Sequence, residues 1–146
     1  MFLKLNIIIV FKTKGKQYNA NVALHIKGTS SRKVNSIKFL GVEIDSKLSW
    51  HEHIGSMRKK IAKGVGILCK ARKVLNVSTL LTLYNSFILP YMTYGIEVWG
   101  SANDCYINDV VTLQKKIIRI MCSKQSGDHT APLFKSLKIL PYPKLH

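Results

Sequence analysis

The sequence predicts an α+β chain, with a small N-terminal antiparallel β-hairpin or three-strand piece followed by a bundle of three to four helices. In the first third, short β-branched runs alternate with polar, glycine-containing turns, which is the pattern of strands. In the remainder, apolar residues recur at helical spacing. A length of 146 residues fits one domain, or one domain and a piece of another.

Three segments have the composition of strands. Residues 7–11 (IIIVF) and 22–26 (VALHI) are each followed by a polar segment with glycine. Residues 37–45 form the third strand, in which Val42 and Ile44 point to one face and Glu43 and Asp45 to the other. The residues that follow, Asp45 to Lys47, have the composition of a turn.

The longest predicted helix covers residues 50–73. Its apolar positions recur every three or four residues, and Gly64 and Gly66 either weaken it or let a neighbouring element approach closely. The apolar positions are Ile54, Met57, Ile61, Val65 and Leu68.

Three further helices are predicted. The second begins at Thr79 with Ser78 as its N-cap, and Pro90 kinks or ends it because proline removes a backbone donor. The third covers residues 106–121, and a short fourth covers residues 132–137 before Pro141.

The charge is strongly unbalanced. Lys and Arg number 23 against 7 Asp and Glu, a formal net charge of +16. This charge favours a polyanionic partner, either nucleic acid or an acidic membrane surface; the alternative is a solvated surface without a partner. We expect nucleic-acid contacts from the basic clusters Lys12, Lys14, Lys16, Arg58, Lys59, Lys63, Lys70, Lys73, Lys115, Lys116 and Arg119.

Cysteine use and hydropathy bear on the compartment. Cys69, Cys105 and Cys122 form no CxxC pair, which predicts a reducing compartment. Cys69 lies beside the apolar stripe of its helix, so we expect it in the protein core. The N-terminus lacks a small-residue cleavage site, so we expect an intracellular protein, nuclear or cytoplasmic, that is not secreted. The uncharged residues 74–96 are long enough to span a bilayer, but their many polar groups favour a buried helix and no membrane partner.

The acidic and histidine residues give weak signals for catalysis. Glu43 and Asp45 share a strand face, as metal-binding carboxylates do, but a turn-forming role for Asp45 is favoured. His51, Glu52 and His53 do not follow the HExxH spacing that puts two histidines on one helix face. We therefore expect no catalytic residue, no metal ligand, no cofactor and no small-molecule substrate in this chain.

A series of short segments lies in order along the chain from residue 37 to residue 140. The segments are IKFLGVEID at 37–45, LSW at 48–50, HI at 53–54, LY at 83–84, ILPY at 88–91, YG at 94–95, VWG at 98–100, LQKKIIRI at 113–120, HT at 129–130 and PLF at 132–134, followed by Leu137, Ile139 and Leu140. In this order they resemble the C-terminal part of the reverse transcriptases of non-LTR (LINE-type, Jockey-like) retrotransposons. The similarity covers roughly residues 34–146, as the order and number of the segments indicate.

The resemblance implies a place within a polymerase. Phe39, Leu40 and Gly41 would form a primer-grip-like hairpin, residues 1–48 the β-rich palm edge, and residues 49–146 a thumb-like helical domain truncated at its C-terminus. The implied partners are an RNA/DNA template–primer duplex and the palm and fingers of the parent polymerase. Magnesium is expected only for the full-length polymerase.

The sequence departs from the family's pattern, most directly at the catalytic motif. The [FY]-A-D-D motif that carries the family's catalytic aspartates is not found in it. We therefore expect a fragment of an RNA-directed DNA polymerase, from a truncated or decayed element or a partial gene model, that is inactive as this chain. The alternatives are an independent small basic nucleic-acid-binding module and, less favoured, a membrane-associated protein.

Overall fold

The computed structural model describes residues 7–11, 25–26 and 29–142, and it confirms the α+β class. The chain divides into two compact units, Met1–His53 and Ile54–His146, here called the strand unit and the helical unit. The predicted boundary between residues 48 and 49 precedes this division, and the assignment of the two parts to a palm edge and a thumb stays a prediction.

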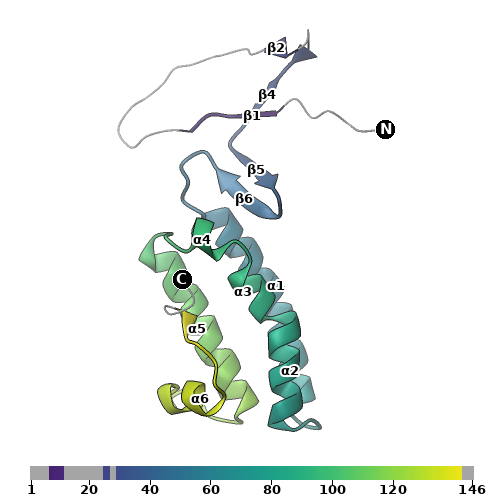
Figure 1. The fold of residues 1–146 in the computed structure, drawn as a ribbon, viewed down its shortest axis with the longest axis vertical. Helices are drawn as coiled ribbons and strands as arrows, with labels where there is room; N and C mark the ends of the chain where they lie inside the picture. The colour runs from purple at the N-terminus through teal and green to yellow at the C-terminus, as the bar shows by residue number, and fades with distance from the viewer. Residues whose placement is uncertain (1–6, 12–24, 27–28, 143–146) are drawn as a thin grey trace. The chain divides into compact units, whose positions relative to one another are not determined.

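Short strands pair in twos within the strand unit (Figure 1). One pair is parallel, which the prediction of an antiparallel piece did not include. The predicted strand over residues 37–45 is wrong as a single strand, because the chain reverses at Leu40 and Gly41 and pairs with itself. The pairs are β1 (Ile7–Ile9) with β4 (Arg32–Val34), β2 (His25–Ile26) with β3 (Thr29–Ser30), and β5 (Ser36–Phe39) with β6 (Val42–Asp45).

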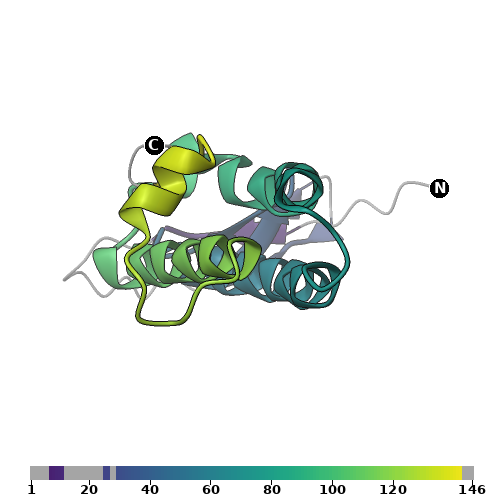
Figure 2. The same cartoon turned by 90° about the horizontal axis from the view of Figure 1, so that it is seen from below.

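The helical unit is arranged in two layers when viewed along its long helices (Figure 2). Helices α1 and α5 form one layer, and α2, α3 and α6 form the other. The helices of the described residues are α1 (His51–Ala71), α2 (Val77–Phe87), α3 (Leu89–Thr93), α4 (Ile96–Trp99), α5 (Asp104–Met121) and α6 (Ala131–Ser136).

The predicted apolar stripe of α1 is confirmed, since its five members are buried: Ile54, Met57, Ile61, Val65 and Leu68. The sequence predicted that Gly64 and Gly66 either weaken α1 or let a neighbouring element approach closely, and close approach is found at Gly64 but not at Gly66. A Cβ at Gly64 would lie 2.9 Å from Cγ1 of the buried Ile88, so α1 and α2 pack together without a side chain there. A Cβ at Gly66 would meet no atom within 4 Å.

The start of α2 differs from the prediction. Asn76, and not Ser78, is the N-cap, because its Oδ1 accepts hydrogen bonds of 2.9 Å from both the backbone N and the Oγ1 of Thr79. The predicted break at Pro90 is confirmed: α2 ends at Phe87, and Pro90 lies in the first turn of α3. Gly95, with φ of 65°, separates α3 from α4 in the left-handed conformation that glycine adopts without penalty.

The uncharged residues 74–96 therefore contain two helices and a turn. None of the helices in the described part of the chain is both long and apolar enough to cross a membrane.

The prediction that Cys69 lies in the core is wrong. Its position on α1 falls just outside the buried stripe, and its side chain is exposed. Cys105 is also exposed and Cys122 is half-buried, and all three are free.

Candidate nucleic-acid interface

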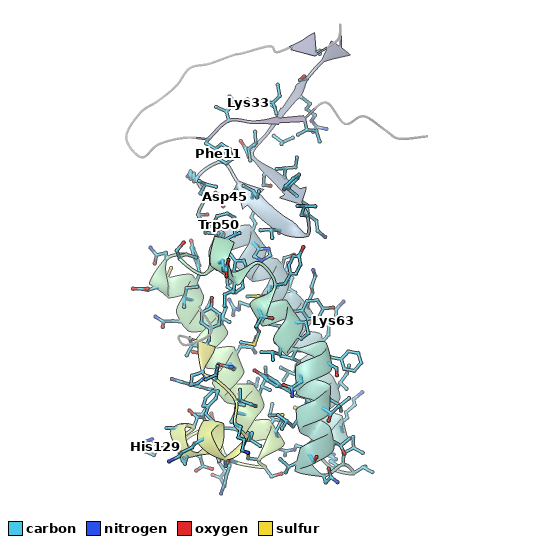
Figure 3. The ribbon with its side chains drawn as sticks, in the orientation of Figure 1. Phe11, Lys33, Asp45, Trp50, Lys63 and His129 are labelled. Atoms are coloured by element: carbon cyan, nitrogen blue, oxygen red, sulfur yellow. The ribbon has the colours of Figure 1, made fainter. Side chains whose placement is uncertain are left out.

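One face of α1 carries a row of exposed lysines. Lys59, Lys63 and Lys70 are exposed, and at 100° per residue they fall within about 40° of one another, opposite the buried stripe. Figure 3 shows Lys63 on the flank of the helical unit away from α5. Glu52 shares this face but lies in the first turn of the helix. The row Lys59, Lys63 and Lys70 is here called the lysine row.

Two other basic residues of α1 have partners inside the helical unit. Arg58 forms an ion pair with Asp109 and so links α1 to α5. Lys60 places its Nζ 5.6 Å from the centre of the Tyr91 ring, a cation–π contact with α3. Of the cluster expected on this helix, Arg58 is therefore engaged in packing, whereas the lysine row faces solvent.

The other predicted basic residues are spread over the chain. Lys115 and Lys116 are exposed on α5, and Lys73 is exposed after the end of α1. Arg119 is half-buried, and its Nε donates a hydrogen bond of 2.9 Å to the backbone oxygen of Asp128. Lys12, Lys14 and Lys16 lie outside the described residues.

The primer-grip-like residues form the tip of the β5–β6 hairpin. Phe39 pairs with Val42, so Leu40 and Gly41 are the two central residues of the turn, with φ of 45° and 84°. Two positive φ values are what a type I′ turn requires, and leucine in this conformation costs about 1–2 kcal/mol. Phe39 and Leu40 are 59% and 74% exposed, so the tip presents two large apolar side chains to solvent.

Asp45 is the centre of a hydrogen-bonded turn, as predicted. Its carboxylate accepts bonds of 2.9 Å from the backbone N of Lys47, Ser49 and Trp50, and one from the Ser49 hydroxyl. Burial alone would raise the pKa of Asp45, but the backbone donors of Ser49, Lys47 and Trp50 outweigh it and lower the pKa. The turn includes two non-glycine residues with positive φ, Leu48 and Trp50, so the carboxylate holds a strained backbone.

The other groups weighed for metal chemistry do not converge. Among the described residues, no three His, Cys, Asp or Glu side chains are placed to hold a metal ion. His53 is buried, and its Nδ1 accepts a bond of 3.3 Å from the backbone N of Glu43, which gives it a structural role within the strand unit.

The sequence did not predict a buried network of hydrogen bonds around Gln114. Gln114 is fully buried on α5, where its Nε2 donates to the Tyr84 hydroxyl and to the backbone oxygen of Leu140, at 3.1 and 3.0 Å. Its Oε1 accepts from the backbone N of Tyr142 at 2.8 Å, and the Tyr142 ring stacks on Trp99 at 5.8 Å. Burial raises the pKa of Tyr142 to about 12 and also raises that of Tyr84, so both phenols stay neutral near pH 7. In the sequence, Gln114 is a polar residue at an apolar position of the third predicted helix, within the segment LQKKIIRI.

Several of the segments that carry the resemblance contribute buried residues to the helical unit. Tyr84, Trp99, Gln114 and Phe134 each belong to one of these segments, and all four are buried. These residues therefore specify the packing of the helical unit, whereas the lysine row lies outside the segments.

Comparison of the sequence with known proteins shows similarity to one class of polymerase. No family model matches the chain, and no solved structure matches it. Four curated proteins do match, and they are RNA-directed DNA polymerases of mobile elements, which confirms the resemblance to the reverse transcriptases of non-LTR, Jockey-like retrotransposons.

All four relatives come from Drosophila. The probable RNA-directed DNA polymerase from transposon X-element of Drosophila melanogaster is 30% identical over 109 residues, which is 72% of this chain and 12% of the relative. The polymerase from mobile element jockey of the same species is 28% identical over 124 residues, 82% of this chain and 13% of the relative. The jockey polymerase of Drosophila funebris is 31% identical over 98 residues, 64% of this chain and 11% of the relative. The chain thus spans only about an eighth of the length of the curated relatives it matches.

Proposed function

We propose that this chain is the palm-edge and thumb portion of a non-LTR reverse transcriptase, and that it contacts the template–primer duplex without polymerising by itself. The similarity to RNA-directed DNA polymerases supports the origin. The observation that carries the contact is the lysine row, three exposed cations on the side of α1 opposite its buried stripe.

The spacing of the row suits a phosphate backbone. At a rise of 1.5 Å per residue, Lys59 and Lys63 are about 6 Å apart along the helix, and Lys63 and Lys70 about 10 Å apart. One strand of B-form DNA advances about 3.4 Å per phosphate, so these intervals are close to two and three phosphate steps. Such contacts supply affinity that is independent of sequence and depends on salt.

The hairpin tip adds a second element to the proposal. Its exposed Phe39 and Leu40 are displayed by a strained turn, and strain of this kind gathers where a protein makes functional contacts. We infer a primer-grip-like role for Phe39, Leu40 and Gly41, in which the apolar tip packs against the primer strand.

A salt titration of duplex binding tests the lysine row. We expect the Lys59→Gln, Lys63→Gln, Lys70→Gln triple variant to reduce the slope of log affinity against log salt by about 2 to 3, because each phosphate contact contributes about 0.9. The matched control is a Lys124→Gln, Lys135→Gln, Lys138→Gln triple variant, which removes the same charge from other exposed positions. Equal loss of slope in both variants would show that net charge alone drives binding, against the proposal.

Primer extension tests the absence of polymerisation. The purified 146-residue chain is incubated with a primer–template, deoxynucleotides and magnesium, beside an active reverse transcriptase as the positive control. We expect no extension of the primer, and robust extension would contradict this part of the proposal. Magnesium is expected to matter only for the full-length polymerase.

An independent nucleic-acid-binding module is the second candidate function. It is favoured by the self-contained core of the helical unit, in which Gln114 ties Tyr84 to Tyr142. A monomer that unfolds in one cooperative transition would support this candidate, because a thumb that needs its palm exposes apolar surface and associates. An intracellular location, nuclear or cytoplasmic, stays a prediction for both candidates.

A further inference from the structure

An apolar groove lies on the surface of the helical unit between α1 and α2. Its volume is about 180 Å³, and its lining consists of Gly64, Ile67, Leu68, Leu83, Phe87 and Ile88. Ile67 and Phe87 are 57% and 60% exposed, so the groove opens to solvent between two large apolar side chains.

Gly64 shapes the floor of this groove. Because a Cβ there would collide with Ile88, the two helices approach closely at this level. The neighbouring Ile67 and Phe87 then stand out on either side and form the walls. A cavity of about 150 Å³ lined by such residues accepts a benzene molecule, so this groove has room for one aromatic or large aliphatic side chain.

The charges around the groove have one sign. Lys63 precedes Ile67 by one helical turn and Lys70 follows it by about one turn, so both flank the α1 wall. Lys60 precedes Gly64 by one turn and lies over the Tyr91 ring. Glu52 is the one acidic residue of α1, at its far end, and α2 has no charged residue. An occupant that complements this surface is apolar at its centre and acidic at its edge.

We propose that this groove docks an acidic amphipathic helix of a partner protein, which inserts one aromatic or large aliphatic side chain between α1 and α2. An apolar helix face laid in a groove between helices, with charges at the rim, is a common mode of peptide recognition. Nucleic acid fits less well, because the polar edges of a base would find no hydrogen-bonding side chain in the lining. A second copy is disfavoured by the charge of +16 on each chain.

A synthetic peptide probes the groove. The probe is an amphipathic helix about four turns long, with Leu and Phe on one face and Glu on the other, labelled for fluorescence anisotropy against the whole 146-residue chain. We expect saturable binding that Ile67→Ser and Phe87→Ser each weaken about tenfold, the usual loss for a central contact. Replacing the peptide's Phe by Ala has the same effect, and replacing its Glu by Lys abolishes binding.

The matched control is Val98→Ser, which removes another exposed apolar side chain of the helical unit outside the groove and leaves binding within about twofold. Circular dichroism verifies that the three variants keep their helices. Equal binding by the Ile67→Ser, Phe87→Ser and Val98→Ser variants would overturn the proposal.

Two other outcomes would assign the groove to a different occupant and also overturn the proposal. One is competition by a single-stranded oligonucleotide whose own binding is lost in Ile67→Ser. The other is a dimer in sedimentation that Phe87→Ser dissociates. The salt slope of duplex binding is expected to be unchanged in Ile67→Ser, so failure of the groove and failure of the lysine row are distinguishable.

Discussion

The strand unit and the helical unit differ in how they hold their backbone. In the helical unit, large side chains such as Trp99, Tyr84 and Ile61 are fully buried. Among the described residues of the strand unit, Val42 is the one buried hydrophobic, and Phe39 and Leu40 are displayed to solvent. Local hydrogen bonds around Asp45 organise the chain there.

The two units therefore draw their stability from different sources. Burial of apolar area contributes about 25 cal/mol per Å², so the helical unit gains its stability from packing. The strand unit relies on turns, which contribute less and leave apolar surface available for contacts. Five experiments on stability test this contrast.

Gln114→Leu tests the buried network of the helical unit. We expect the free energy of unfolding to fall by about 3 kcal/mol, because the Tyr84 hydroxyl, the Leu140 carbonyl and the Tyr142 N–H lose their buried partner. Urea denaturation followed by far-UV circular dichroism measures the change. Asn108→Leu, a polar-to-apolar change at an exposed position of α5, serves as the control. A loss below about 1 kcal/mol would mean that packing alone maintains the core.

Asp45→Ala tests the strand unit. Removing a carboxylate that accepts several backbone bonds should destabilise the turn before α1 by about 2 kcal/mol. Hydrogen exchange of the Ser49 and Trp50 amides measures the local effect. If the contrast between the units holds, exchange in the core of α5 changes little.

The same residue predicts a dependence on pH. The folded pKa of Asp45 is lowered, so its contribution to stability is complete above the ordinary carboxyl value near 4 and is lost as pH falls below it, through the lowered folded value. We expect protection of the Ser49 amide to fall in this acidic window in the native chain. In the Asp45→Ala variant, whose turn is already open, this dependence should be absent; an identical pH profile would contradict the assignment.

Gly64→Ala and Gly66→Ala form a matched pair on α1. Gly66→Ala should stabilise by about 0.5–1 kcal/mol, since alanine is the better helix former and its Cβ meets nothing. Gly64→Ala should destabilise by about 1 kcal/mol, because the Cβ collides with Ile88 and this outweighs the propensity gain. Thermal unfolding of both variants side by side gives the sign directly. A stabilised Gly64→Ala would show that α2 shifts at little cost.

Leu40→Asn has the smallest expected effect. The Asn-Gly pair is preferred in type I′ turns, so the hairpin should gain about 0.5–1 kcal/mol. Hydrogen exchange of the β5–β6 amides measures the gain, with Phe39→Asn as the control that removes an exposed side chain without relieving the turn. If Leu40 is retained for contact with the primer, this more stable variant should bind duplex less tightly.

Local patterns in the sequence predicted the elements that depend on neighbours along the chain. The spacing of Ile54, Met57 and Ile61 predicted the buried face of α1, and Pro90 predicted the break that follows α2. Lys59, Lys63 and Lys70 were among the predicted basic residues, and the helical period puts them on the side of α1 opposite its buried stripe. The hydrophobic pattern did not predict the hairpin at Leu40, because leucine is not a residue typical of turns with positive φ. The resemblance to reverse transcriptases did indicate a hairpin at this place.

Contacts between residues far apart in the sequence were not predictable from local patterns. Arg58 looked like its neighbours Lys59 and Lys63, yet it pairs with Asp109, which is 51 residues away. Gln114 looked like a polar interruption of an apolar stripe, yet Tyr84, Leu140 and Tyr142 satisfy it from separations of 26 to 30 residues. A sequence fixes the period and composition of each element through short-range sterics. The partners of a buried polar or charged group depend on how whole helices pack, and no local pattern encodes that arrangement.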